Sequence, residues 1–309
     1  MRSAAKPRTV DFYARKLTRV LCFEPLANAN LDEVDEALIE SYVQERAKQV
    51  SPASVNRELA TLRRLLRLAQ EWQVINRVPR IHMLPGERNR EFVLSYQPEN
   101  LYLEIAPQPL RDVALLILDT GLRPGEALAL QWHDVHLDPA NGARFGYLHV
   151  RLYADAGKSK YARRNLSLTS RVRSMLEARN LTASSPWVFA SEDGLRPLSI
   201  FTLDDQHSRT RSLLKLGKEF VVHSLRHTFG TRMGEAGADA FGIKRLMGHS
   251  SVAVSQRYVH PSPESLERAF ERLESMNEKA VRRLPEGTKV QPVPTKVPTP
   301  KDDLERRVS

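Results

Sequence analysis

The stretch HSLRHTFGTRMGEAGADAFGIKRLMGHSSVAVSQRYVHP (223–261) carries the clearest structural and chemical signals in the chain. It begins with a helical pattern in which His223 and Arg226, at positions i and i+3, share one face. A glycine then ends the pattern, His249 follows, and a short segment leads to Tyr258. A guanidinium can clamp a phosphodiester, an imidazole can move or orient a proton, and a phenol can attack phosphorus. The stretch therefore predicts a helical domain that handles phosphate.

A further arginine in an unusual setting lies upstream, in TGLRPGE (120–126). The residue before a proline favours extended backbone, so Arg123 is expected in a turn between two helices, with its side chain free to reach a ligand. Glu126 falls in the first turn of the second helix, where its carboxylate can hold the guanidinium and suits the helix dipole. Taken alone, the segment is equally compatible with a plain helix–turn–helix connector that carries a surface ion pair.

A zinc site is the metal alternative for this region. His223 and His227 have the i, i+4 spacing of a zinc pair, but no acidic residue follows His223 as in a metalloprotease motif. The chain has one cysteine, Cys22, and it lies far away in the sequence. We therefore predict neither a metal nor a cofactor, and we expect His227 to pack or to form a hydrogen bond beside the site.

The composition limits the class of protein. With 309 residues the chain can form two domains, each with its own core. A formal net charge of +10 favours a polyanionic partner, of which nucleic acid is the commonest. No apolar run approaches the length of a membrane span, the N-terminus lacks the apolar core of a signal peptide, and one cysteine allows no internal disulfide. These features predict a cytoplasmic, nucleic-acid-binding protein without membrane contact.

The sequence divides into two periodic parts. Residues 1–85 predict a small helical domain, with helices over 7–22, 32–49, 53–73 and 74–80. The polar stretch 86–97, which follows a proline, is expected to be a linker. Residues 98–284 predict a second domain, and the proline-rich tail 285–309 is expected to be disordered. In the second domain we expect strands over 146–153 and 164–168, joined by a loop, and helices over 111–120, 124–132, 170–179, 200–217, 223–236, 239–247, 251–258 and 263–283.

The helix predicted over 53–73 has two unlike faces. Its apolar face comprises Val55, Leu59, Leu62, Leu65, Leu66, Ala69 and Trp72. Its opposite face carries Arg57, Arg63, Arg64 and Arg67, with Glu58 as the one acid nearby. An arginine face of this kind favours a DNA contact over the alternative of a solvated charged surface.

In order and spacing, the arginine, histidine and tyrosine residues resemble the active site of the tyrosine recombinases, the phage integrase family. The similarity runs from about residue 6 to 280 and is sharpest over 118–130 and 221–261. The resemblance implies a mainly α fold with an N-terminal helical core-binding (SAM-like) domain. An α-rich catalytic domain with a small antiparallel β-sheet or hairpin would follow it. Ser167 departs from the family pattern, which often has proline there, and this affects a strand end rather than the chemistry.

The resemblance also implies a role for each residue. Tyr258 would attack the scissile phosphorus and form a 3′-phosphotyrosyl bond, with neither metal nor ATP. Arg123 and Arg226 would stabilise the phosphorane, His223 would assist deprotonation of the tyrosine, and His249 would donate to a phosphate oxygen.

The loop between the two predicted strands, ADAGKSKYAR (154–163), resembles the family's lysine hairpin. By the family's register Lys158 is the general acid, although a shift of two residues would select Lys160 instead. We expect Lys160, Arg163 and Arg164 to contact DNA.

The family's assembly implies the partners. These would be double-stranded DNA with inverted-repeat core sites and three further copies of the chain, giving a homotetramer on DNA and a monomer when free. Accessory proteins are a further expected class of partner. The predicted helix over 263–283, with Leu266, Phe270, Leu273 and Met276 on one stripe, would dock on a neighbouring copy. Since the chain begins almost at once on the first helical domain, we expect one of the simpler members, without an extra DNA-binding domain.

Two other functions fit parts of this pattern. A non-catalytic DNA-binding relative would occupy sites without cutting them, but such a protein can lose the tyrosine or an arginine, and none is missing here. A type IB topoisomerase uses a similar site without a partner duplex, but the small helical first domain and the modest length favour recombination.

Overall fold

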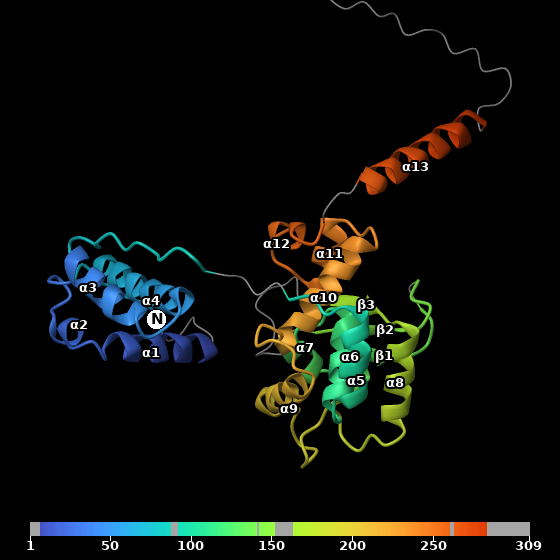
Figure 1. Cartoon of the computed structure of the whole chain (residues 1–309), viewed down its shortest axis with the longest axis horizontal. Helices are drawn as coiled ribbons and strands as arrows, with labels where there is room; N and C mark the ends of the chain where they lie inside the picture. Colours follow the sequence, from blue (N-terminus) through green and yellow to red (C-terminus); the bar gives the residue numbers. More distant parts are fainter. Residues whose placement is uncertain (1–6, 88–91, 141, 152–162, 260–262, 283–309) are drawn as a thin grey trace, which may run out of the picture. The chain divides into compact units, whose positions relative to one another are not determined.

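The computed structural model describes residues 7–87, 92–140, 142–151, 163–259 and 263–282 (Figure 1). This part of the chain contains two separate hydrophobic cores, one in the N-terminal helices and one in the second domain. The structure thus has the two-domain, mainly α fold predicted from the sequence. The N-terminal helices are α1 (Pro7–Val20), α2 (Glu24–Asn28), α3 (Glu36–Ala47) and α4 (Pro52–Glu71).

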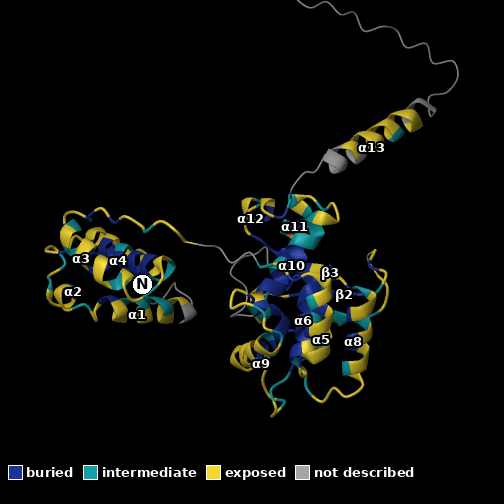
Figure 2. Ribbon diagram, in the orientation of Figure 1, coloured by how far each residue is buried: buried dark blue, intermediate teal, exposed yellow. Residues whose placement is uncertain are grey.

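Helix α4 is the centre of the N-terminal domain. Apolar side chains between Val55 and Ala69 form its buried face and pack with residues of α1 and α3. The buried residues of α4 are dark blue in Figure 2. Trp72, which we expected on this face, is instead 63% exposed. The helix ends at Glu71, and Gln73 then turns the chain with a positive φ, so Trp72 leaves the line of the buried stripe.

The helix predicted over 74–80 does not form. This segment is irregular, and Ile75 and Ile81 pack into the core of the domain. The side-chain amide of Asn56 donates to the carbonyl of Leu84 at 2.9 Å and accepts from its backbone N–H at 2.7 Å. Within 74–80 itself, Glu36 Oε1 of α3 accepts from the Arg80 N–H at 3.1 Å, and Gln70 Nε2 of α4 donates to the Asn76 carbonyl at 3.1 Å. Side chains of other elements thus bond to this backbone in place of a helix.

Glu58 is buried on α4 among polar partners. Its carboxylate accepts from the Tyr42 hydroxyl at 2.7 Å and from the Arg46 Nε at 3.0 Å, and Lys16 lies 3.7 Å away. Burial alone would raise the pKa of Glu58, but the hydrogen bonds from Arg46 and Tyr42 bring it below its ordinary value. The acid that lies near the arginine face in sequence is therefore an internal tie between α1, α3 and α4.

The second domain consists of helices around a small sheet. Its strands, in the order β1-β2-β3, are all antiparallel. The elements are α5 (Tyr96–Ile105), α6 (Leu110–Thr120), α7 (Pro124–Leu128), the 3-10 helix η1 (Trp132–Asp134), β1 (Val135–His136), β2 (Tyr147–Val150), β3 (Arg164–Ser167), α8 (Ser170–Asn180), α9 (Ile200–Leu213), α10 (Val222–Glu235), α11 (Ala240–Met247) and α12 (Ala253–Gln256).

The sheet is shorter and has one more strand than the sequence predicted. We expected two strands, over 146–153 and 164–168, and the structure adds β1 at the edge. Leu148 of β2 pairs with Leu166 of β3, and both are buried. Burial alternates along β3, so Arg164, two residues before Leu166, also faces inward.

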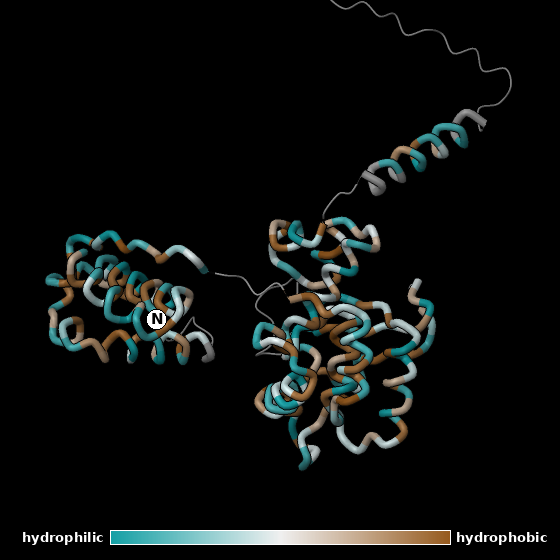
Figure 3. The backbone as a smooth tube through the Cα atoms, viewed as in Figure 1, coloured by the Kyte–Doolittle hydropathy of each residue, from teal (hydrophilic) through white to brown (hydrophobic). Residues whose placement is uncertain are grey.

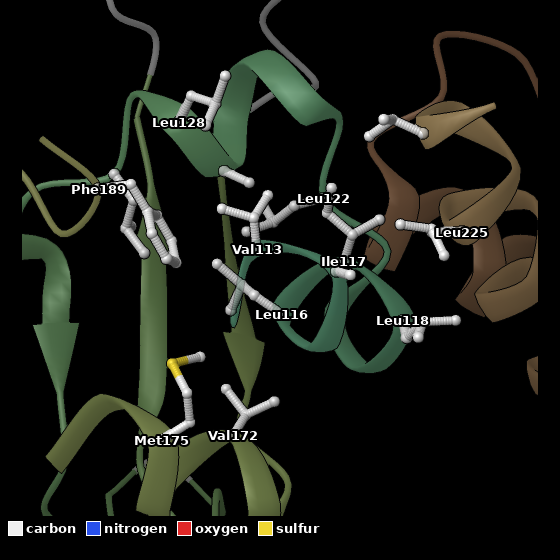
Figure 4. Packing of buried hydrophobic residues seen from close by; sticks show 14 of the residues in the cluster. Val113, Leu116, Ile117, Leu118, Leu122, Leu128, Val172, Met175, Phe189 and Leu225 are labelled. Carbon is white, nitrogen blue, oxygen red and sulfur yellow. The ribbon is translucent and has the colours of Figure 1, made fainter. Parts of the chain in front are cut away.

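Helix α6 is the core of this domain. It is hydrophobic along most of its length (Figure 3), and its side chains pack with residues from the sheet, α8 and α10 (Figure 4). Gly121 ends the helix with a φ of 65°, a left-handed conformation that glycine adopts readily. A Cβ at this position would lie 2.3 Å from the Phe229 ring of α10. Helices α6 and α10 can therefore approach each other as closely as the site requires.

The predicted linker over 86–97 ends earlier than expected. Leu94 is fully buried in the core of the second domain, and its N–H donates to the Thr228 hydroxyl of α10 at 2.9 Å. Helix α5 begins at Tyr96. The last residues of this stretch therefore belong to the packing of the second domain, which begins before Pro98.

Helix α13 (Pro263–Arg282) is described by itself. Phe270, Leu273 and Met276 of its expected stripe are exposed, and the side chain of Leu266 lies outside the described residues. The tail 285–309 lies outside them as well. In the described part of the chain, no helix has the length and apolar character of a membrane span.

Replacing Glu58 by Gln should destabilise the N-terminal domain by about 3 kcal/mol, because Arg46 then keeps a half-buried charge without its partner. Glu71→Gln is the matched control, since the Arg64–Glu71 pair is exposed and 3.8 Å apart, and it should cost less than about 0.5 kcal/mol. Urea unfolding monitored by circular dichroism measures both. Equal effects of the two substitutions would contradict the assignment of Glu58 as an internal tie.

Candidate active site

Helix α10 supplies the first part of the site. Arg226 is 2% exposed, and its Nη1 and Nη2 donate to the carbonyls of Gly121 and Met247, each at 2.5 Å. Burial and the nearby Arg123 lower the pKa of Arg226 to about 9. The guanidinium therefore stays charged at neutral pH, but in a place where its charge has little water around it.

Arg123 takes the extended backbone predicted from the following proline, with φ −67° and ψ 147°, at the N-cap of α7. Its Nη1 donates to Glu126 Oε1 at 2.8 Å, and its Nη2 donates to the carbonyl of Gly248 at 2.9 Å. The Arg123 N–H also donates to Glu126 Oε2 at 2.9 Å. The side chain is 37% exposed, so the guanidinium is both fixed in position and open to a ligand.

The structure contradicts the role that we predicted for Arg164. We expected it to contact DNA, but its side chain is 4% exposed and lies inside the domain. Its Nη2 donates to Glu126 Oε2 at 2.8 Å, and its Nε donates to the carbonyl of Leu246 at 2.6 Å. Basic residues after a loop suggest a solvent-facing hairpin, whereas the pleat of β3 directs this one inward.

The C-terminal end of α11 links the three arginines. The carbonyls of Leu246, Met247 and Gly248 accept from Arg164, Arg226 and Arg123 respectively. Gly248 has a φ of 64° and ends the helix. The last carbonyls of a helix have no partner within it and carry the negative end of the helix dipole, which makes them suitable acceptors for cations.

Tyr258 is 5% exposed and lies between two histidines. Its hydroxyl is 3.2 Å from His227 Nδ1, and its ring is stacked against that of His249 with centroids 6.3 Å apart. Gly230 of α10 makes room for the ring, because a Cβ there would lie 2.9 Å from it. The tyrosine is also close enough to Arg226 for an electrostatic interaction.

His249 is buried, and its Nδ1 is 2.8 Å from the Ser255 hydroxyl. Burial, Arg226 and Arg123 lower the pKa of His249 to about 3, so the ring is neutral near pH 7. When Ser255 donates to Nδ1, the ring proton is on Nε2, which can then donate to a ligand. Ser255 was not identified from the sequence, which gives no signal that this serine is buried.

His223 and His227 lie one helical turn apart on α10. His223 is partly open to solvent. The protein around its ring and the positive charges of Arg226 and Arg123 lower the pKa of this histidine. We expected His223 to assist the tyrosine, whereas in the structure His227 is the histidine at hydrogen-bonding distance from the Tyr258 hydroxyl. Sequence spacing placed both rings near the site but could not say which one reaches the phenol.

The remaining predicted contacts differ in their surroundings. Three of the arginines predicted to contact DNA are exposed on α4, namely Arg57, Arg64 and Arg67. Arg63 instead donates a hydrogen bond to the carbonyl of Ile81 and so stabilises its own domain. Arg163 is exposed beside β3. Lys158 and Lys160 lie outside the described residues. Within the described ranges, no three His, Cys, Asp or Glu side chains are grouped so that they could hold a metal ion.

With the fold and the geometry of the site established, comparison with known families identifies the class of protein. Residues 95–265 match the phage integrase family, and residues 2–71 match the phage integrase N-terminal SAM-like domain. The chain belongs to the phage integrase family, whose general activity is site-specific recombination of DNA.

Curated relatives align along most of the chain. It is 28% identical over 279 residues to the tyrosine recombinase XerC of Pelobacter propionicus, covering 86% of this chain and 89% of the relative. It is also 28% identical over 281 residues to the tyrosine recombinase XerD of Caulobacter vibrioides, covering 85% and 89%.

Solved structures share the fold. The Tn1549 transposon integrase in complex with a circular intermediate DNA gives a TM-score of 0.72 at 19% identity, covering 88% of this chain and 95% of that chain. The site-specific recombinase XerH bound to its difH substrate gives a TM-score of 0.62 at 21% identity, covering 85% and 78%.

Replacing Gly230 by Ala should displace the Tyr258 ring, because the added methyl group would lie 2.9 Å from the ring atoms and 3.0 Å from the sulfur of Met247. We expect the hydrogen bond between Tyr258 and His227 to be lost while the domain remains folded. A crystal structure of the variant, with thermal unfolding as the control for folding, measures this. An unmoved ring would show that the contact with α10 does not determine the position of the tyrosine.

Proposed function

We propose that this protein cuts and rejoins duplex DNA through a covalent bond between Tyr258 and a 3′-phosphate. The observation that carries the proposal is the convergence of Arg123, Arg226, His249 and Tyr258, drawn from four separate segments, on the end of α11. The phosphotyrosyl bond conserves the energy of the phosphodiester, so a hydroxyl from a partner strand can reverse the attack without ATP.

The arginines are proposed to bind the non-bridging oxygens of the scissile phosphate. Negative charge builds on these oxygens in the transition state, and fixed donors in a site with little water stabilise it strongly. Arg123 and Arg226 are already held in place by backbone carbonyls and Glu126, so little reorganisation is needed when DNA binds. A bound phosphodiester would also bring negative charge close to the desolvated guanidinium of Arg226.

The histidines are proposed to act as neutral groups. His249, with its pKa near 3, would donate from Nε2 to a phosphate oxygen without adding charge. The contact with His227 would hold the Tyr258 hydroxyl before DNA arrives, and His223 would assist its deprotonation. We propose Lys158, by the family's register, as the acid for the leaving 5′-oxygen.

The assembly is proposed from the family. The N-terminal domain would bind the duplex with Arg57, Arg64 and Arg67, which are exposed along one helix. Four copies would hold two DNA sites with inverted repeats, and action on genomic DNA would place the protein in the cytoplasm. The Tn1549 integrase was solved with a circular intermediate DNA and XerH with its difH substrate, which supports DNA as the partner here.

Tyr258→Phe removes one hydroxyl and leaves the backbone contacts to DNA, so we expect DNA affinity to persist and the covalent complex to vanish. A nicked suicide substrate traps the complex, and a denaturing gel detects it. A covalent band in the variant would exclude Tyr258 as the nucleophile. Tight binding by the wild-type protein without any covalent band would instead favour a non-catalytic DNA-binding role, and relaxation of supercoiled DNA without strand exchange would favour a topoisomerase.

Arg226→Lys and Arg123→Lys should each slow cleavage by on the order of 100-fold, because an ammonium cannot reproduce the two-pronged geometry of the guanidinium. Single-turnover cleavage at saturating protein separates this effect from DNA binding. Arg209→Lys on α9 is the control, since Arg209 pairs only with the neighbouring exposed Asp205 of its own helix among the described contacts. Cleavage near the wild-type rate in either site variant would limit that arginine to binding.

A further inference from the structure

We propose that Arg164 is a positioning residue for the cleavage reaction, which sets the place of Arg123 and of the end of α11 through the carboxylate of Glu126. This inference rests on the proposed function, because it assigns to Arg164 an effect on the same phosphate site. It replaces the DNA contact that the sequence suggested for this arginine.

The first observation is that one carboxylate serves two arginines. Glu126 Oε1 accepts from Arg123 Nη1 at 2.8 Å and from Arg164 Nη1 at 3.3 Å. Glu126 Oε2 accepts from Arg164 Nη2 at 2.8 Å and from the Arg123 N–H at 2.9 Å. A rotation of the carboxylate would therefore disturb both the guanidinium of Arg123 and the backbone turn that carries it.

The second observation is that Arg164 also bonds to the helix that holds the other arginines. Its Nε donates to the carbonyl of Leu246, next to the carbonyls of Met247 and Gly248 that accept from Arg226 and Arg123. One side chain on β3 thus joins the start of α7 to the end of α11. Tyr258 and His249 follow α11 in the chain, so they depend on the same junction.

The third observation concerns charge. Arg164 and Glu126 are both 4% exposed at their side chains, so neither can exchange its partner for water. In the described part of the chain, the charged groups that act on Glu126 are Arg123 from the start of α7, Arg164 from β3 and Arg226 from α10. Burial would raise the pKa of Glu126, and the hydrogen bond from Arg164 is the first of the interactions that bring it below its ordinary value.

A lysine cannot take this place. Arg164 donates in two directions, to the carboxylate and to the Leu246 carbonyl, from a planar group whose donors diverge. An ammonium is a point donor at the end of a flexible chain and can satisfy one acceptor well. Arg164→Lys therefore keeps the charge and tests the geometry alone.

The experiment measures single-turnover cleavage of a suicide substrate and DNA affinity for three variants, Arg164→Lys, Arg164→Met and the pair Glu126→Gln with Arg164→Met. We expect Arg164→Lys to slow cleavage by on the order of 100-fold, because a small misplacement of a group that binds the phosphate can cost this much. DNA affinity should be unchanged. Arg173→Met is the control, because Arg173 pairs with Glu177 on the surface of α8, and it should cleave like the wild type.

The pH profile separates positioning from a loss of folding. In Arg164→Met the pKa of Glu126 should rise, because burial then acts against one arginine partner fewer, so cleavage should decline on acidification at a higher pH than in the wild type. The double variant has no ionisable group at position 126 and should cleave slowly without this decline. If Arg164→Met fails to fold, as thermal unfolding will show, Arg164→Lys and the double variant carry the test.

Crystal structures of the wild type and Arg164→Lys supply a readout that does not need catalysis. The proposal predicts that the Arg123 guanidinium leaves the Gly248 carbonyl in the variant. An unchanged Arg123, or cleavage at the wild-type rate, would overturn the positioning role. If the wild-type protein forms no covalent complex, the proposed function fails, and the structures still decide whether Arg164 positions Arg123.

Discussion

The site depends on how three guanidiniums, of which Arg164 and Arg226 are buried, are held close together. Like charges at short range repel, and the burial of two of these arginines removes solvent that would screen their charge. The structure offsets this with the single carboxylate of Glu126 and with three successive carbonyls at the negative end of α11. The turn before α7, the start of β3 and the end of α11 must all meet at this point. Their meeting fixes where α12 and the tyrosine after it can lie.

The same environment leaves the arginines charged and the buried histidine neutral. Arg226 keeps its charge, although burial and Arg123 bring its pKa down to about 9, while the pKa of His249 falls to about 3. The arginines thus provide the positive charge, and the imidazoles provide hydrogen bonds without charge. A phosphodiester is suited to such a pocket, since it brings negative charge to the guanidiniums and acceptors to the rings. The close approach of Tyr258 to Gly230 gives the phenol its place beside them.

The sequence predicted those features of the site that depend on neighbouring residues, and it did not predict those that depend on partners distant in the chain. Arg123 was placed correctly in a turn because the next proline restricts its backbone, and Glu126 was assigned to it from helical spacing. Arg164 was misjudged because a charged residue among polar neighbours looks solvated until its partner, distant in sequence, is known. The helix predicted over 74–80 does not form for a similar reason, because side chains of other elements, Glu36 and Gln70, bond to that backbone.

The central claim is that Tyr258 forms the covalent bond to DNA. The most direct measurement is mass spectrometry of the wild-type protein trapped on a suicide substrate, after digestion of both protein and DNA. Our account predicts a nucleotide attached through its 3′-phosphate to the peptide that contains Tyr258. Attachment to another residue, attachment through a 5′-phosphate, or a trapped complex without any covalent adduct would contradict it.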